Sequence, residues 1–209
     1  MATGYAVFAN GGYKVEPFVI DHIVDYQGHV ILQTNPPQAS SADEKTIPPR
    51  AIPEDVAFLT HTALQSVIQH GTAQEAKSLN RLDIAGKTGT TNDQVDAWFA
   101  GYMPDLVVTT WVGFDNPMPL HEYAAKLALP IWIDFMKTAL THFPEHAMPQ
   151  PSNVIAVHIN PHTGLREENS KSSIIEYFRD TEIPGERDTS SPLDDEQSQQ
   201  ENSNQDSLF

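Results

Sequence analysis

The sequence predicts an α+β fold in which helices flank an antiparallel sheet. Two segments, 53–71 and 122–143, carry apolar residues at helical spacing. Between them, three segments rich in β-branched or aromatic residues follow one another with only short polar turns in between. A chain of 209 residues with 39% hydrophobic residues is long enough to bury one substantial core.

The amino-terminal part predicts a short helix and a hairpin. Apolar residues recur at helical spacing from Met1 to Phe8, and Gly11-Gly12 is a typical helix end. In 17–34, two β-branched runs surround Gln27-Gly28, which favours a hairpin. Residues 35–53 are rich in Pro, Ser and Ala without periodicity and predict a surface connection.

The clearest predicted helix covers 53–71. Pro53 lies near its start, Glu54 and Asp55 favour its positive end, and Gly71 stops it. Its expected apolar stripe consists of Val56, Leu59, Ala63, Val67 and Ile68.

The segments 83–91, 95–104 and 106–115 predict a meander of three antiparallel strands. The helix predicted at 122–143 contains Pro130, which either kinks it or opens its main part. Residues 153–167 predict a further strand and turn. We therefore expect an ordered part over 1–185 and an acidic, disordered tail over 186–209, where apolar residues are almost absent.

Composition excludes several classes of function. The formal net charge of −16 argues against a nucleic-acid partner. The absence of cysteine excludes thiol catalysis and Cys-ligated zinc. We predict no transmembrane segment and no signal peptide, because no apolar run is long enough; an export signal would then lie outside this sequence.

The segment "DIAGKTGTTNDQVDAWF" (83–99) contains Gly86-Lys87-Thr88, which could end a phosphate-binding P-loop. That motif also requires a glycine at the position of Arg81 and a helix directly after the Lys-Thr pair. The residues that follow Thr88 begin a helix poorly and alternate like a strand. The sequence therefore disfavours a phosphate-binding loop.

A strand at the edge of a cleft can instead bind an extended peptide, which adds alongside it through backbone hydrogen bonds. Gly89 would let such a peptide approach the backbone closely. Thr88 and Thr90 lie two residues apart, so their hydroxyls share a face and could hold a carboxylate. Lys87 supplies the positive charge, but strict alternation places it on the other face, so convergence requires strand twist or the reach of its stem.

The stretch "AGKTGTTND", followed by "DAWFAGY" and "WVGFD", resembles the transpeptidase domain of class A penicillin-binding proteins, of the penicillin-binding protein 1A type. "MATGYAVFANGGYKVEP" and "LPIWIDFM" match in the same order, so the resemblance covers nearly the whole chain. It implies a penicillin-binding/β-lactamase-like serine acyl-transferase fold. It also implies a peptidoglycan D,D-transpeptidase that cross-links stem peptides, takes β-lactams as donor mimics and needs no cofactor.

The resemblance also implies roles for individual residues. Lys87 would serve proton transfer and electrostatics, and the Thr90 backbone N–H would form half of the oxyanion hole. Thr88 and Thr90 would bind the terminal carboxylate, with Gly89 and Thr91 completing the substrate strand. Trp98 or Phe99 would line the cleft, although these aromatic residues, like Trp111, Phe114, Trp132 and Phe135, are expected to be mostly core residues.

Two other catalytic motifs of that family are not found. No serine has a lysine three positions on, so the nucleophile motif Ser-x-x-Lys is absent. Ser78-Leu79-Asn80 has the form Ser-x-Asn, but it lies too close to Lys87 and is interpreted as a chance match. His158 and His162 are separated by Pro161 and predict no metal site.

We therefore expect the carboxy-terminal part of such a transpeptidase, inactive alone and dependent on an amino-terminal part of the same protein. The alternative is a non-catalytic interaction domain that docks onto a separate amino-terminal fragment. The expected location of the parent protein is the periplasmic face of the bacterial inner membrane.

Overall fold

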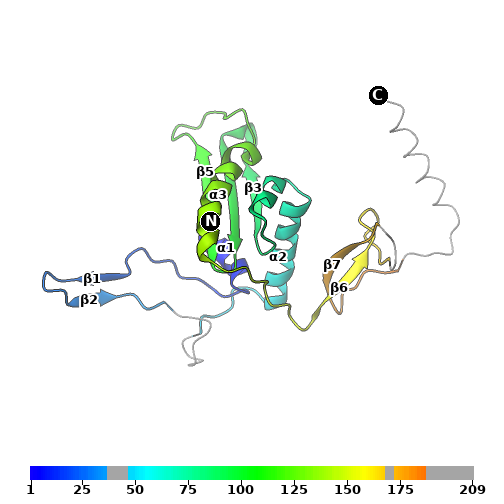
Figure 1. Cartoon of the computed structure of the whole chain (residues 1–209), viewed down its shortest axis with the longest axis horizontal. Coiled ribbons are helices and arrows are strands. Elements are labelled where there is room, and N and C mark those ends of the chain that lie inside the picture. Colours follow the sequence, from blue (N-terminus) through cyan, green and yellow to red (C-terminus); the bar gives the residue numbers. More distant parts are fainter. Residues whose placement is uncertain (37–46, 168–171, 187–209) are drawn as a thin grey trace. The chain divides into compact units, whose positions relative to one another are not determined.

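The computed structural model describes residues 1–36, 47–167 and 172–186 (Figure 1). The chain divides into two compact units, residues 1–154 and residues 155–209. The expected acidic tail, apart from residue 186, and the middle of the 35–53 connection lie outside the described residues.

The first unit is built on a three-stranded antiparallel sheet. Its strands are β3 (Ala85–Thr90), β4 (Asp96–Met103) and β5 (Leu106–Gly113), in the spatial order β3-β4-β5. The predicted meander is therefore confirmed. The turn between β3 and β4 contains the short 3₁₀ segment Asn92–Gln94, in which Asp93 has a left-handed φ of 57°.

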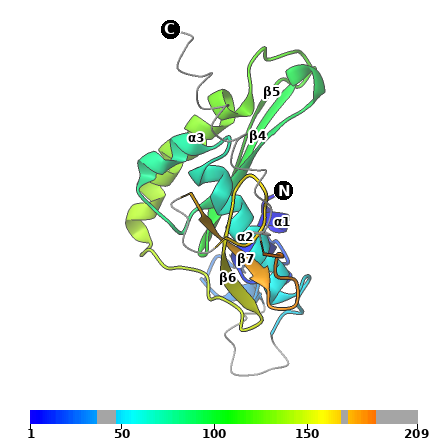
Figure 2. The same cartoon turned by 90° about the vertical axis from the view of Figure 1, so that its right-hand side faces the viewer.

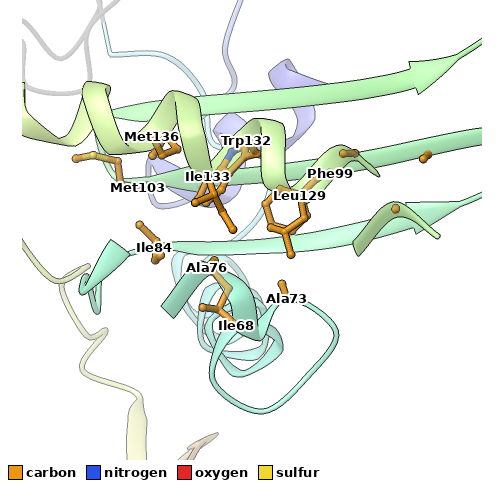
Figure 3. Packing of buried hydrophobic residues seen from close by; sticks show 13 residues of the cluster. Ile68, Ala73, Ala76, Ile84, Phe99, Met103, Leu129, Trp132, Ile133 and Met136 are labelled. Carbon is orange, nitrogen blue, oxygen red and sulfur yellow. The ribbon is translucent and has the colours of Figure 1, made fainter. Parts of the chain in front are cut away.

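Helix α3 (Ala124–Ala139) covers one face of this sheet and runs beside β4 and β5 (Figure 2). Figure 3 shows the side chains of α3 pointing toward Phe99 and Met103 of β4, and the rings of Phe99 and Trp132 meet edge to face with centroids 4.9 Å apart. Pro130 lies inside α3, so it does not open the main part of the helix. The buried residues contributed by α3 are Ala124, Ala128, Leu129, Trp132, Ile133 and Met136.

Helix α1 (Ala2–Ala9) covers the opposite face of the sheet. Tyr5, Phe8 and Ala9 form a second cluster with Ala85 and Tyr102. These two strand residues are paired across β3 and β4, and they alternate with the residues that face α3. The predicted helix end is confirmed: Gly12 has a φ of 102°, and a Cβ there would lie 2.4 Å from the Ile52 carbonyl oxygen.

Helix α2 (Glu54–Gln69) is followed by the 3₁₀ helix η2 (Gln74–Leu79). The predicted apolar stripe of α2 is wrong in part, since Ala63 is exposed while Ala57, Phe58 and His61 are buried with Ile68. The difference arises because His61 lies on the buried face, where its Nδ1 is 3.2 Å from the Tyr102 hydroxyl oxygen. Burial lowers the pKa of His61 to about 4, although the Asp83 carboxylate opposes the shift.

The segment that leads into β3 is fixed by a buried ion pair. Arg81 donates from Nε and Nη2 to the two Asp83 carboxylate oxygens at 2.8 and 2.6 Å. The same guanidinium donates to the carbonyl oxygens of Phe143 and Pro144, beyond the end of α3. The residue that disfavours a phosphate-binding loop therefore ties the start of β3 to the segment after α3.

The predicted hairpin is present as β1 (His22–Val24) and β2 (Val30–Gln33), with Gly28 at a φ of 86°. Every residue of both strands is exposed. Val19, which precedes β1, is 100% exposed and Ile31 is 68% exposed. The hairpin thus presents apolar side chains on both of its faces.

The second unit contains β6 (Val154–Ile159), whose first residue belongs to the first unit, and β7 (Ile174–Arg179), which pair as a two-stranded sheet. The predicted strand within 153–167 corresponds to β6. The sequence analysis missed β7, although the run Ile174-Ile175 followed by Tyr177-Phe178 has the composition of a strand. It also gave no indication of the division after residue 154.

Candidate active site

Strand β3 is an edge strand of its sheet, and the predicted site residues lie along it. Lys87 is paired with Ala100 and Gly89 with Trp98, so their side-chain positions share the face of α1. Thr88 and Thr90 alternate with them and share the face of α3. The register therefore separates Lys87 from the two threonines, as strict alternation requires.

The lysine stem bridges this separation. Lys87 Nζ donates to the Thr88 carbonyl oxygen at 2.9 Å and to Thr88 Oγ1 at 3.2 Å. The ammonium group thus lies at the open edge of β3, next to a hydroxyl on the other face. The arrangement places a positive charge and a hydroxyl donor where a carboxylate could bind both.

The backbone of β3 is also directed toward its open edge. The Thr91 amide donates to the Asp96 carbonyl oxygen at 3.1 Å, which makes these two residues a hydrogen-bonded pair. Because such pairs alternate along an antiparallel ladder, the N–H of Thr90 points away from β4. An extended peptide or an oxyanion at this edge would therefore meet a backbone donor from Thr90.

Both threonine hydroxyls are held by groups from other elements. Thr88 Oγ1 lies 2.8 Å from Oγ1 of Thr72, in the turn between α2 and η2. Thr90 Oγ1 accepts a hydrogen bond from the Ala124 amide at 3.2 Å, at the first residue of α3. Thr91 differs, since its Oγ1 accepts from the Asp96 amide at 2.9 Å and closes the turn into β4.

A cavity of about 230 Å³ lies over β3 and β4 on the face of the sheet that α1 covers. Trp98 lines it, whereas Phe99 is completely buried in the core, so of the two expected aromatic residues only Trp98 lies at the cavity. Trp132 is buried like Phe99, but the expectation of a core position is wrong for Trp111, Phe114 and Phe135, whose exposed fractions are 43, 49 and 52%. The other lining residues are Met1, which precedes α1, Tyr5 of α1, Ala100 of β4 and residues 87–91.

Two glycines of β3 differ in what their Cβ positions would meet. A Cβ on Gly89 would meet only Trp98 Cβ, at an ordinary 3.5 Å, so the protein interior does not require glycine there. A Cβ on Gly86 would lie 2.7 Å from Phe99 Cζ and 2.9 Å from the Ala100 carbonyl oxygen. Gly86 is therefore required by packing, whereas the small size of Gly89 leaves space in the cavity that it lines.

The structure also places the residues that sequence analysis set aside. The Ser78 hydroxyl donates to the Glu75 carbonyl oxygen at 2.7 Å, a local bond within η2. His158 Nδ1 lies 3.3 Å from Ser173 Oγ in the second unit. Within the described ranges, no group of three or more histidine and carboxylate side chains is arranged to hold a metal ion. No helix in this part of the chain is long and apolar enough to cross a membrane.

Sequence reasoning missed the supporting groups of the site. Thr72 and the Ala124 amide lie far from β3 along the chain, and nothing in their local sequence marks them as neighbours of Thr88 and Thr90. The contribution of Tyr5 to the cavity was missed for the same reason. Burial raises the pKa of the Tyr5 hydroxyl, so this phenol stays protonated near neutral pH.

An ammonium group, two hydroxyls and an outward backbone N–H thus lie together along one edge strand, an arrangement that could bind the carboxylate end of an extended peptide. Residues 1–137 match the family model described as the penicillin-binding protein transpeptidase domain. The chain belongs to this family.

The relatives within this family are penicillin-binding proteins of the 1A type, which confirms the resemblance noted in the sequence. Penicillin-binding protein 1A of Pseudomonas aeruginosa is 36% identical over 88% of the chain, and that of Neisseria lactamica is 42% identical over 75%. A crystal structure of penicillin-binding protein 1A from Haemophilus influenzae superposes with a TM-score of 0.76 at 34% identity over 88% of the chain. The chain covers only 28%, 19% and 32% of these three proteins, respectively.

Proposed function

We propose that this chain supplies the substrate-binding strand of a peptidoglycan D,D-transpeptidase, for which stem peptides are substrates and β-lactams are mimics. The observation that carries the proposal is the meeting of Lys87 Nζ and Thr88 Oγ1, 3.2 Å apart, at the open edge of β3. The terminal carboxylate of a D-Ala-D-Ala peptide would bind there and at Thr90. Its penultimate carbonyl oxygen would meet the Thr90 N–H, one half of an oxyanion hole.

The nucleophile of this reaction would come from a polypeptide outside the printed sequence. In the parent enzyme, a serine attacks the penultimate D-Ala carbonyl carbon and D-Ala leaves. An amine of a neighbouring stem peptide then takes the acyl group and restores the serine. The printed chain holds no Ser-x-x-Lys, so we propose that it binds donor peptides but forms no acyl-enzyme alone. The parent protein would act at the periplasmic face of the inner membrane.

The proposal is tested by titrating the ¹⁵N-labelled chain with N-acetyl-D-Ala-D-Ala and, separately, with its carboxy-terminal amide. The dipeptide should shift the amide resonances of residues 87–91, and the amide derivative should bind at least about ten-fold more weakly, since it lacks the charge that Lys87 attracts. Equal binding of both compounds, or shifts that avoid β3, would contradict the proposal.

The alternative, a non-catalytic interaction domain, is favoured by one observation, the exposed apolar surface of the β1–β2 hairpin. In that reading the chain docks onto an amino-terminal polypeptide without contributing to a site. Reading the gene upstream of residue 1 separates the two functions, because an open frame that encodes Ser-x-x-Lys is required only by the transpeptidase.

A further inference from the structure

Thr72 and Thr88 form a pair of hydroxyl groups beside the proposed carboxylate site. Their oxygens are 2.8 Å apart, and Thr88 Oγ1 also accepts a hydrogen bond from Lys87 Nζ. A threonine hydroxyl has one proton and two acceptor positions. The two hydroxyls together carry two protons. One forms the hydrogen bond between the two oxygens, and the other can be donated in a hydrogen bond to a third group.

The hydrogen bond from Lys87 favours one direction for the hydrogen bond between the two hydroxyls, with Thr72 as donor and Thr88 as acceptor. An ammonium group can only donate, so Lys87 Nζ occupies one acceptor position of Thr88 Oγ1. If Thr72 donates to Thr88 as well, both acceptor positions are occupied by protein groups. The Thr88 proton then has no role in the pair and is available to a ligand acceptor. Successive donation from Thr72 to Thr88 to an anion polarises each bond and strengthens the last one.

The Thr90 hydroxyl also accepts a hydrogen bond from a protein group, which leaves its own proton available. Thr90 Oγ1 accepts from the Ala124 amide at 3.2 Å. Helix α3 begins there, and its N-cap residue Tyr123 makes no side-chain capping bond, so Thr90 satisfies a donor that the helix leaves free. Accepting from Ala124 also leaves the Thr90 proton available. Thr88 and Thr90 thus each have a hydrogen-bonding partner from outside β3.

We propose that Thr72 is a positioning residue that fixes the Thr88 hydroxyl as a donor toward the carboxylate of a bound peptide. The proposal rests on the proposed function, because it assumes that β3 binds a carboxylate. Thr72 itself need not touch the ligand. Its effect would be on the preference for a carboxylate over an uncharged group, since only an anion gains fully from a polarised hydroxyl donor.

The test compares wild type, Thr72→Val, Thr72→Ser and Ser78→Ala in the titration with N-acetyl-D-Ala-D-Ala and its amide, and Thr72→Ala replaces Thr72→Val if valine disturbs the fold. Valine keeps the size of threonine but removes the hydroxyl, and serine restores it. Ser78→Ala removes a hydroxyl that donates to the Glu75 carbonyl oxygen within η2. We expect Thr72→Val to lower the carboxylate-to-amide affinity ratio by roughly three- to ten-fold. Thr72→Ser and Ser78→Ala should stay within about two-fold of wild type.

The outcomes separate this inference from the proposed function. If wild type prefers the carboxylate and Thr72→Val keeps the same ratio, the positioning role is wrong while the proposed function stands. If wild type shows no preference, the proposed function fails and this inference fails with it. If Thr72→Val and Thr72→Ala both lose the dispersed amide spectrum of a folded chain, Thr72 is required for folding and the positioning role is overturned.

Discussion

Lys87 Nζ lies 3.2 Å from Oγ1 of Thr88, although the two side chains leave β3 on opposite faces. The lysine stem folds over the open edge of the strand, and its ammonium group also holds the Thr88 carbonyl oxygen at 2.9 Å. A charge and a hydroxyl donor therefore meet at one edge without a break in the strand. This relationship underlies the proposed binding of a peptide carboxylate.

Removing the charge of Lys87 should weaken carboxylate binding. Lys87→Ala is expected to lower the affinity for N-acetyl-D-Ala-D-Ala by roughly ten-fold or more, within the range for hydrogen bonds to charged groups. The affinity for the amide derivative should change much less. Lys137→Ala is a matched control, because it removes an exposed lysine that pairs with Asp134 on α3. An equal loss with both variants would show a general charge effect and contradict the prediction.

Gly86 and Gly89 should respond differently to alanine. Gly86→Ala places a Cβ 2.7 Å from Phe99 Cζ and 2.9 Å from backbone atoms, so we expect a loss of about 1–3 kcal/mol in the free energy of unfolding. Gly89→Ala should change that free energy by less than about 1 kcal/mol, because its Cβ meets only Trp98. It should weaken dipeptide binding, because the added methyl group takes up space in the cavity that Gly89 lines. Urea denaturation of both variants measures the difference. Equal stabilities would contradict the packing argument.

His61 should make stability depend on pH. Its folded pKa of about 4 is below the ordinary value of 6.5, so between these values the unfolded chain binds a proton that the folded chain does not. The stability that neutral His61 contributes is present above pH 6.5 and is lost as the pH falls toward 4. At about 1.4 kcal/mol per pKa unit, the loss is at most roughly 3.5 kcal/mol.

The measurement is the difference in unfolding free energy between wild type and His61→Gln at several pH values. This difference isolates His61 from the many carboxylates that also titrate on acidification. Between pH 7 and pH 4.5, the unfolding free energy of wild type should decrease relative to that of His61→Gln. A difference that stays constant over this range would show that His61 is not buried in its neutral form.

The ion pair of Arg81 and Asp83 should be sensitive to the loss of one partner. Asp83 is 2% exposed and the guanidinium donates to it through two nitrogens, so Asp83→Asn leaves the largely buried Arg81 with only the more distant and exposed Glu145 carboxylate, 3.9 Å from its Nε. We expect destabilisation of about 3–5 kcal/mol. Asp134→Asn, which breaks the exposed pair with Lys137, should change stability by less than about 1 kcal/mol. Comparable effects at both sites would contradict the structural role of the buried pair.

The exposed hairpin should make the isolated chain associate with itself. Val19 and Ile31 are 100% and 68% exposed, and burial of such surface is favourable. Sedimentation velocity at increasing concentration should show oligomers for wild type. Because threonine keeps a high strand preference, Val19→Thr combined with Ile31→Thr should reduce association without unfolding the hairpin. A wild-type chain that stays monomeric at all concentrations would contradict this prediction.

The sequence predicted those parts of the fold that local signals define. Gly11-Gly12 and Gly28 mark a helix end and a turn, and the β-branched and aromatic runs from 83 to 115 mark the meander. The prediction of the buried face of α2 was wrong in part, because the hydrophobic pattern treats histidine as polar, whereas His61 is buried against Tyr102. Tertiary contacts of this kind leave no periodic signal.

Sequence reasoning identified only those residues of the candidate site that lie on strand β3. Lys87, Thr88 and Thr90 follow one another in the sequence, and alternation already separated the lysine from the threonines. Thr72 and the Ala124 amide reach the site only through the packing of α2 and α3 against the sheet. Their contribution could not be inferred without the structure.

The central claim is that β3 serves a transpeptidase whose nucleophile lies outside these 209 residues. It is tested most directly by incubating the chain with fluorescent penicillin, alone and with an amino-terminal polypeptide that carries Ser-x-x-Lys. We predict no covalent label on the chain alone, and label on the amino-terminal polypeptide only when the chain is present. Covalent labelling of this chain alone would contradict the claim.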